Sequence, residues 1–289
     1  MGKILLKKLT RFGFGGEARE LVVARTENSI TSALRKPYYI LGDGTNVIAS
    51  DKGFKGRVVK VATSGLEIKK NKILCEAGVK LQKLVDTANK NGLEGLETLA
   101  GIPGTVGGAI FGNAGAYGKE ISDNLKRVKI FDGSQARWIP KKSCAFSYRE
   151  SVFSAKGGSA SGGKTNPWVI LAAEFRFKKS GPKQLIKKSK GVVKVREKKY
   201  RPDLRCAGSI FKNIVVEGGK IPAGSLLESV GAKEMRIGGV YVAPYHANLL
   251  INNGRGKAAD AKKLINILKN KVYKKYGIRL EEEVRYLGF

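Results

Sequence analysis

Residues 99–118, LAGIPGTVGGAIFGNAGAYG, form the most unusual stretch of this chain, with seven glycines among twenty residues. Glycine loses more conformational entropy on folding than any other residue, so a segment this rich in glycine needs a compensating reason. A close approach of the backbone to another group is such a reason. The stretch therefore predicts a loop that lies against a flat cofactor.

A second glycine turn lies upstream, where the apolar strand expected from residue 38 runs into GDGTN at residues 42–46. Glycine-rich turns can direct several backbone N–H groups at one anion. Asp-Gly and Thr-Asn are also common in ordinary turns. The residues alone therefore leave a phosphate-binding turn and a plain turn equally favoured.

Hydrophobic spacing around these two segments predicts an α+β fold. Helices are expected over residues 79–91, 182–199 and 261–276, with Tyr276 on the apolar face of the last one. Gly92 and Gly277 are expected to end the first and the last helix. Short apolar or alternating blocks predict strands within residues 124–138, 168–178 and 278–289. The basic helix over residues 182–199 marks the expected boundary to a C-terminal domain.

Length and composition indicate a cytoplasmic globular protein. With 289 residues, 42% of them hydrophobic, the chain can bury the cores of two or three subdomains. It contains no run of eighteen apolar residues and no recognisable signal peptide. Its three cysteines fit reduced thiols. The one histidine, His246, is expected to be structural, and no metal site is expected.

The formal net charge is +31, from 55 Lys and Arg against 24 Asp and Glu. A nucleic-acid-binding protein is one explanation of this charge. The lysines, however, are spread over the whole chain, and no aromatic and basic platform or recognition-helix motif accompanies them. Solvated faces are the favoured interpretation, and a small phosphate-bearing substrate would benefit from the positive field.

Two nucleotide-binding patterns are matched by letter alone. Residues 158–165, GSASGGKT, fit the P-loop pattern, but Asn166 and Pro167 follow where a helix must begin. Residues 13–18, GFGGEA, fit a dinucleotide fingerprint without a preceding strand. Neither segment is expected to hold a nucleotide, and residues 156–164 predict a mobile loop.

Six segments, in the same order, resemble the UDP-N-acetylenolpyruvoylglucosamine reductase family over nearly the whole chain. They are LGDGTNVIASD (41–51), GIPGTVGGAIFGNAGAYG (101–118), CAFSYRESVF (144–153), AGSIFKN (207–213), HANLLIN (246–252) and GIRLEEEVRYLG (277–288). The resemblance implies an FAD-binding domain of the vanillyl-alcohol-oxidase type in two subdomains, residues 1–62 and 63–180. An α+β substrate domain, residues 181–289, would follow. The compact form of the family, which has no lid tyrosine, is the better match.

The resemblance implies an FAD enzyme that uses NADPH to reduce UDP-N-acetylglucosamine enolpyruvate to UDP-N-acetylmuramate, for peptidoglycan precursor synthesis. A monomer with a small-molecule substrate, and with no nucleic-acid or membrane partner, is expected. Asp43 departs from the family's usual turn and should point away from the FAD diphosphate. The implied FAD-binding residues are Gly42, Asp43, Gly44, Thr45, Asn46, Gly101, Ile102, Pro103, Gly104, Thr105, Gly107, Gly108, Asn113, Ala114 and Gly115.

The resemblance also implies three catalytic residues that converge beside the FAD. They would act on the charge that develops once a hydride from flavin N5 adds to the enolpyruvyl group. Arg149 would clamp the carboxylate, Ser209 would protonate the neighbouring carbon, and Glu283 would help to hold the enol form. Lys212 and Asn213 would contact the substrate. A different flavin enzyme of the same fold, an oxidase of alcohols or sugars, is the alternative, and it would not need these three residues.

Overall fold

The computed structural model describes residues 4–35, 37–154, 168–201 and 203–289, and these residues form two units. Unit 1 consists of Met1–Glu20, Gly44–Lys55 and Lys199–Phe289, and unit 2 of Leu21–Asp43 and Gly56–Lys198. The chain therefore changes unit four times. It does so within β2 (Glu17–Ala24), after Asp43, within β5 (Phe54–Val61) and at the end of α4 (Pro182–Lys199). The three domain ranges expected from the sequence stay a prediction, and the loop at residues 156–164 lies outside the described residues.

Unit 2 is built around an antiparallel five-stranded sheet in the order β12-β11-β13-β7-β6. The central strand, β13 (Val169–Arg176), is buried along all of its length except the last residue. The apolar run VILAAEF is typical of a strand that is covered on both faces. Ala173 in this strand pairs with Val128 on one side and with Cys75 on the other. The other strands of the sheet are β6 (Leu66–Lys69), β7 (Lys72–Glu76), β11 (Leu125–Phe131) and β12 (Ala136–Pro140).

Shorter elements complete unit 2. The strand expected at residue 38 is β3 (Tyr38–Leu41), which pairs in parallel with β5. Two further strand pairs are β8 (Leu93–Glu94) with β14 (Lys178–Lys179), and β9 (Gly115–Ala116) with β10 (Lys119–Glu120). The short α-helices are α1 (Glu27–Ser32) and α3 (Val106–Phe111). The 3₁₀ helices, labelled η, are η2 (Glu97–Leu99), η3 (Ile121–Asn124) and η4 (Lys141–Cys144).

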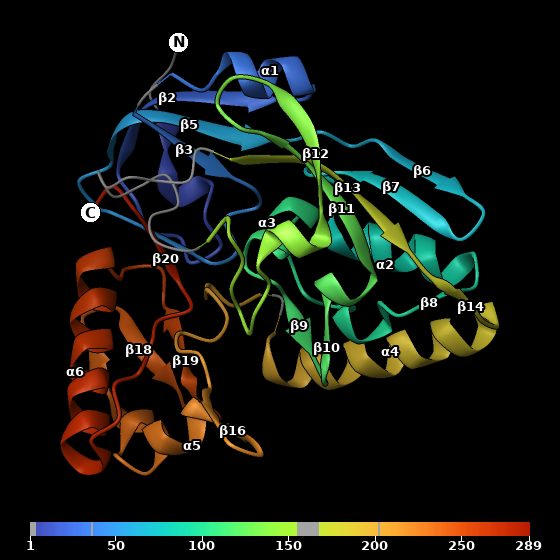
Figure 1. Ribbon diagram of the computed structural model, residues 1–289. Coiled ribbons are helices and arrows are strands. Elements are labelled where there is room, and N and C mark those ends of the chain that lie inside the picture. Colours follow the sequence, from blue (N-terminus) through green and yellow to red (C-terminus); the bar gives the residue numbers. More distant parts are fainter. Residues whose placement is uncertain (1–3, 36, 155–167, 202) are drawn as a thin grey trace. The chain divides into compact units, whose positions relative to one another are not determined.

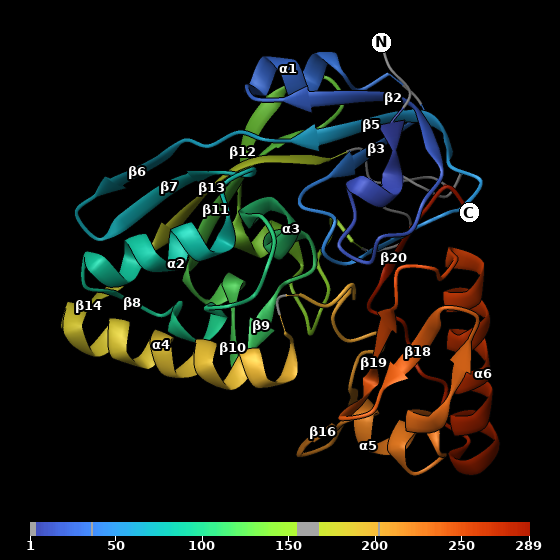
Figure 2. The ribbon, with the colours of Figure 1, turned by 180° about the vertical axis from the view of Figure 1, so that it is seen from behind.

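The helix expected over residues 79–91 is α2 (Leu81–Lys90), which buries the apolar side chains whose spacing predicted it. Gly92 follows it with φ +64°, the left-handed conformation that ends many helices. Figures 1 and 2 show α2 between the strands β6 and β7 and the basic helix α4. The sheet, α2 and α4 thus form successive layers of unit 2.

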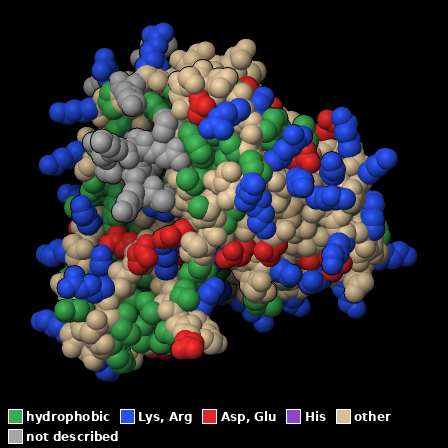
Figure 3. Space-filling model, viewed as in Figure 1, with side chains coloured by type: hydrophobic (Ala, Val, Ile, Leu, Met, Phe, Trp, Pro, Cys, Tyr) green, Lys and Arg blue, Asp and Glu red, His purple; other side chains and the backbone are tan. Residues whose placement is uncertain are grey.

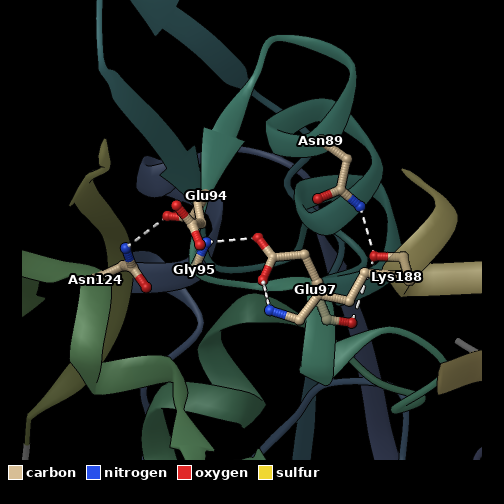
Figure 4. Close-up of polar contacts among 7 residues, drawn as sticks. Asn89, Glu94, Gly95, Glu97, Asn124 and Lys188 are labelled. Atoms are coloured by element: carbon tan, nitrogen blue, oxygen red, sulfur yellow. Dashed lines mark hydrogen bonds and ion pairs between the residues drawn. The ribbon is translucent and has the colours of Figure 1, made fainter. Parts of the chain in front are cut away.

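A buried polar cluster joins α4 to the segment just before the glycine loop (Figure 4). Glu97 is 2% exposed, and its carboxylate accepts hydrogen bonds from the Gly95 N–H at 2.6 Å and from the Lys188 ammonium at 3.2 Å. Ser189, the next residue of α4, donates to the Glu97 carbonyl and accepts from the Asn89 amide at 2.7 Å. The start of the glycine loop is therefore fixed by both α2 and α4.

Unit 1 packs α6 (Ala258–Tyr276) on the antiparallel sheet β17-β18-β19 (Figure 2). Gly277, with φ +69°, ends the helix as expected. Tyr276, expected on the apolar face, is not part of the buried core, because this side chain is 40% exposed and bonds to Ser229 at the surface. The strands are β17 (Arg236–Ile237), β18 (Val240–Ala243) and β19 (His246–Asn252), and the buried face of α6 consists of Ala258, Ala261, Leu264, Ile265, Leu268 and Val272.

The C-terminal strand of unit 1 is shorter than the sequence predicts. Only β20 (Arg285–Leu287) is regular, and it pairs in parallel with β4 (Val47–Ala49). Glu282, before it, forms an isolated bridge with Phe211. Leu280 and Val284 are buried, as their alternation predicts. The remaining elements of unit 1 are β1 (Ile4–Leu5), η1 (Leu6–Lys8), β15 (Ile214–Val216), β16 (Gly219–Ile221), α5 (Ala223–Glu228) and η5 (Ala232–Glu234).

Candidate active site

The two glycine segments meet at Gly42 and Thr105, both in unit 2. Thr105 caps α3 by accepting a hydrogen bond from the Gly108 N–H at 3.2 Å. A Cβ atom added at Gly42 would lie 2.7 Å from the Thr105 hydroxyl oxygen. Glycine is therefore required at residue 42 by the close approach of the second segment. The sequence predicted both segments as cofactor loops but not that they touch.

Asp43 is held by a cation that the sequence did not single out. Its carboxylate forms an ion pair with the Lys80 ammonium. The backbone of Lys80 in turn forms a bridge with Thr105. The acidic side chain beside the proposed diphosphate-binding turn is thus neutralised by Lys80. Whether it points away from the diphosphate stays a prediction.

The second half of the GDGTN turn belongs to unit 1. Gly44 has φ +63°, and a Cβ atom there would collide with the Leu9 carbonyl oxygen. Asn46 donates its side-chain amide to the Glu283 carbonyl at 2.9 Å, and its own carbonyl accepts from the Arg285 N–H at 3.0 Å. The turn is therefore bound to the segment that carries the predicted catalytic glutamate.

Arg149 lies against the end of the glycine loop. Its guanidinium Nη2 donates to the Gly115 carbonyl at 2.6 Å. Asn113, which is fully buried, donates its side-chain amide to the Glu120 carboxylate at 2.6 Å and to the Ser147 carbonyl at 2.8 Å. Arg149 and Asn113 have φ +59° and +42°, a region that costs free energy for residues other than glycine. Unit 2 therefore brings the predicted arginine and the predicted cofactor loop together.

The structural reason for glycine differs from one position of the loop to another. A Cβ atom at Gly107 would lie 2.9 Å from the Ala77 Cβ, so this glycine is needed for packing. Gly101 and Gly104 have φ +75° and +127°, which glycine adopts at no steric cost. Ile102, Pro103, Gly108 and Ala114 lie between or beside these residues. The buried Asn113 Oδ1 atom has no hydrogen-bond partner among the described residues.

Ser209 is half-buried in unit 1, in a short bridge with Leu249 of β19. Gly208 precedes it with φ +77°, and the Ile210 N–H after it donates to the Asn248 carbonyl at 3.0 Å. The Ser209 hydroxyl lies 3.1 Å from the hydroxyl of Tyr200, with which it forms a hydrogen bond. No sequence motif drew attention to Tyr200.

The three consecutive glutamates differ in their contacts. Glu281 accepts a hydrogen bond from the Lys212 ammonium at 2.6 Å, and Glu282 accepts from the Lys269 ammonium at 2.8 Å and from the Tyr286 hydroxyl at 2.5 Å. Burial, together with the Glu282 carboxylate, raises the pKa of Tyr286 well above its usual range. The Glu283 N–H donates to the Ile210 carbonyl at 2.7 Å, which places its backbone beside that of Ser209.

The two predicted substrate-binding residues have structural contacts of their own. Lys212 is 6% exposed and pairs with Glu281, and the Asn213 side-chain oxygen accepts from the Ala223 N–H at 3.1 Å at the start of α5. His246 accepts a hydrogen bond from the Asn248 N–H. Its burial, and then the nearby Lys199 charge, lower the pKa of His246 to about 4. It is therefore neutral near pH 7, consistent with a structural role.

Two sequence profiles match this chain. An FAD binding domain covers residues 21–137, and the C-terminal domain of UDP-N-acetylenolpyruvoylglucosamine reductase covers residues 198–287. The UDP-N-acetylenolpyruvoylglucosamine reductase of Solibacter usitatus is 42% identical and covers 98% of this chain and 95% of its own. The chain belongs to this reductase family.

Other members of the reductase family agree. The UDP-N-acetylenolpyruvoylglucosamine reductase of Pseudothermotoga lettingae is 34% identical over 96% of this chain and 94% of its own. The crystal structure of UDP-N-acetylenolpyruvylglucosamine reductase from Thermus caldophilus matches with a TM-score of 0.81 at 29% identity, covering 99% of this chain and 98% of that one. The chain is therefore an FAD-dependent oxidoreductase of peptidoglycan precursor synthesis, and the predicted family, fold class and cofactor are confirmed.

The described residues of this reductase fit FAD. The two glycine segments approach each other at Gly42, the acid of the turn is neutralised by Lys80, and the buried Asn113 Oδ1 has no partner in the described part of the chain. The GFGGEA segment runs into strand β2, so it does not have the strand, turn and helix order of a dinucleotide fingerprint. Within the described ranges, no group of His, Cys, Asp and Glu could hold a metal ion, and no helix is long and apolar enough to cross a membrane.

Proposed function

We propose that this reductase converts UDP-N-acetylglucosamine enolpyruvate and NADPH to UDP-N-acetylmuramate, with Arg149, Ser209 and Glu283 as its catalytic residues. The observation that carries the activity is the 42% identity to a reductase of that name across 98% of the chain. Bound FAD supplies hydride transfer from NADPH to the enolpyruvyl group. The residues of the chain then have to hold a carboxylate and deliver one proton.

Arg149 is suited to hold the carboxylate of the substrate. Its guanidinium stays protonated and presents a planar fork that matches two carboxylate oxygens. The bond from Nη2 to the Gly115 carbonyl orients the group at the proposed FAD loop. A left-handed backbone at a residue other than glycine costs about 1–3 kcal/mol and is frequent at functional sites. The φ of +59° at Arg149 therefore supports a functional role.

Ser209 and Glu283 are suited to the proton step, and both lie in unit 1. After hydride addition, negative charge develops on the neighbouring carbon and its carboxylate. The O–H bond of Ser209 breaks as the new C–H bond forms, and Glu283 stabilises the enol. A hydroxyl is a weak acid, so this transfer depends on orientation. The backbone bond from Glu283 to Ile210 at 2.7 Å and the short bridge from Ser209 to Leu249 support such an orientation.

The FAD, substrate and domain assignments from the sequence are retained as proposals. The fifteen residues of the two glycine segments would hold FAD, and Lys212 and Asn213 would bind the UDP-sugar. Residues 1–62 and 63–180 would form the FAD-binding subdomains and residues 181–289 the substrate domain. The three buried cysteines and the use of NADPH support a cytoplasmic location, and the expected monomer is retained as a proposal.

The proposal is tested with the two half-reactions of Ser209→Ala. The anaerobic yellow protein should bleach with NADPH at the rate of the unaltered protein. Recovery of the flavin absorbance on adding the enolpyruvyl sugar nucleotide should be slower by about 10²-fold or more, because the proton donor is missing. Ser229→Ala, a surface hydroxyl in the same unit, is the matched control and should recover normally.

Two outcomes would contradict the proposal at different levels. Normal recovery in Ser209→Ala would exclude Ser209 as the proton donor but would leave the assignment of the substrate unaffected. Failure of the unaltered protein to recover its absorbance with the enolpyruvyl sugar nucleotide would remove the assigned substrate.

A further inference from the structure

Tyr200 is the side chain that bonds to the hydroxyl of Ser209. It follows α4 directly, and its phenolic oxygen lies 3.1 Å from the Ser209 hydroxyl oxygen. Both residues belong to unit 1, and both are half-buried. Either oxygen can donate the hydrogen in this bond. The contact therefore joins a phenol to the hydroxyl that is proposed to deliver the proton.

The position of the phenol is fixed by packing on several sides. The Tyr200 ring packs against the cluster formed by Cys206, Ala243, Leu249 and Ile251. Its centroid lies 6.1 Å from that of the neutral His246 ring, and the Lys199 ammonium lies 5.3 Å from the ring centroid. Leu249 also forms the backbone bridge with Ser209. The same strand thus positions both partners of the hydroxyl pair.

The chemistry of the proton step needs such a partner. An alkyl hydroxyl that gives up its proton becomes an alkoxide, which is costly in a half-buried site unless a donor meets it. A phenol is a stronger acid than an alkyl hydroxyl and can donate a hydrogen bond to that oxygen.

We propose that Tyr200 positions the Ser209 hydroxyl and restores its proton, an inference that rests on the proposed function. As the Ser209 O–H bond breaks and the substrate C–H bond forms, the Tyr200 proton passes to the Ser209 oxygen. Water then returns one proton to the Tyr200 oxygen. Each transfer moves one proton, and no oxidant or further reductant is needed. Tyr200 acts through Ser209 and does not itself touch the substrate carbon.

The test compares Tyr200→Phe with a matched tyrosine in the holoenzyme. Tyr276 forms the same kind of pair with Ser229 at 2.6 Å on the surface of unit 1, so Tyr276→Phe removes an equivalent hydroxyl. Tyr200→Phe should bleach with NADPH at an unchanged rate. Its flavin reoxidation by the enolpyruvyl sugar nucleotide should be slower by about tenfold or more at saturation, with little change in the half-saturating concentration. Tyr276→Phe should behave like the unaltered protein in both steps.

A second comparison separates action through Ser209 from a general structural effect. In a Ser209→Ala background, Tyr200→Phe should cause no further loss of the reoxidation rate, because the residue through which it acts is already missing. A further loss of tenfold in that background would overturn the inference. So would an unchanged rate in the single variant Tyr200→Phe when Ser209→Ala is slow. If Ser209→Ala reoxidises normally, the proposed role of Ser209 fails first, and this inference fails with it.

Discussion

Three adjacent carboxylates, Glu281, Glu282 and Glu283, meet three different surroundings. Glu281 is bound by Lys212, and Glu282 is bound by Lys269 and Tyr286. Glu282 would have broken the alternation of a regular strand, and the structure places it in an isolated bridge with Phe211 instead. Its carboxylate therefore serves the packing of unit 1, whereas Glu283 is held through its backbone next to Ile210.

Glutamine at each of two positions should separate these roles. Glu282→Gln weakens a partly buried ion pair and should lower the free energy of unfolding by about 1–2 kcal/mol, with normal flavin reoxidation. Glu283→Gln should slow reoxidation by about 10-fold to 10²-fold, with a normal bleaching rate. Urea denaturation and anaerobic stopped-flow absorbance measure the two effects. Equal slowing of reoxidation in both variants would contradict the assignment of Glu283.

The residues of the candidate site were predictable only to the extent that a motif carried them. Arg149, Ser209 and Glu283 stand in segments whose order resembles the family, although spacing alone would not select them. Tyr200 and Lys80 stand in no such segment, and their partners Ser209 and Asp43 become neighbours only through the fold. A hydrogen bond between side chains on separate loops leaves no periodic signal in the sequence.

At the scale of elements, the glycine loop depends on the polar cluster that precedes it. Glu97 connects Gly95 to Lys188, and Ser189 connects Glu97 to Asn89. Asn89, Glu97 and Ser189 are buried, so the hydrogen bonds among them replace those that water would provide (Figure 4). The loop therefore begins from a rigid position even though its own glycines are permissive.

Removal of the Glu97 carboxylate should destabilise unit 2. Glu97→Ala leaves the Gly95 N–H and the Lys188 ammonium without this acceptor, and we expect a loss of about 2–4 kcal/mol in unfolding free energy. Lys188 is half-exposed, which keeps the loss at the lower end. Glu94→Ala, an exposed neighbour, is the control and should change stability by less than about 0.5 kcal/mol. Chemical denaturation measures both, and equal stability of the two variants would exclude this role of Glu97.

Helices were better predicted than strands because their signal is local. The apolar spacing of α2 and α6 and the glycines after them lie within one segment. The C-terminal strand, in contrast, exists only where β4 is available as a partner, and β4 comes from residues 47–49. The exposure of Tyr276 also depends on the rest of the fold. The apolar spacing continues to the end of α6, but this end lies beyond the core.

At the scale of the whole molecule, the Lys and Arg residues behind the net charge of +31 are spread along the entire sequence. Figure 3 shows Lys and Arg side chains scattered over the visible face, with Asp and Glu side chains among them. Dispersed charge of this kind raises the local concentration of anions without forming a specific site. Both proposed substrates carry phosphates, so the field should assist their encounter with the protein.

Added salt should therefore lower the rate at which the substrates encounter the protein without changing kcat. Between about 20 and 300 mM NaCl we expect kcat/KM for NADPH and for the enolpyruvyl sugar nucleotide to fall by about 3-fold to 10-fold, because the screening length shortens. The value of kcat should remain nearly constant. Sucrose at matched viscosity is the control. An unchanged kcat/KM across this range would show that the positive charge has no part in substrate capture.

The assembly of unit 1 from three distant stretches also governs the order in which a newly made chain can fold. Translation proceeds from the N-terminus at about 5–20 residues per second. Unit 2 is complete when Lys198 has left the ribosome, whereas β4 has to wait for β20, in which Tyr286 pairs with Ile48. During that interval the edge of β4 is unpaired in the nascent chain, and unpaired edges invite pairing with other chains. Protection by a chaperone would matter most while residues 199–289 are being synthesised.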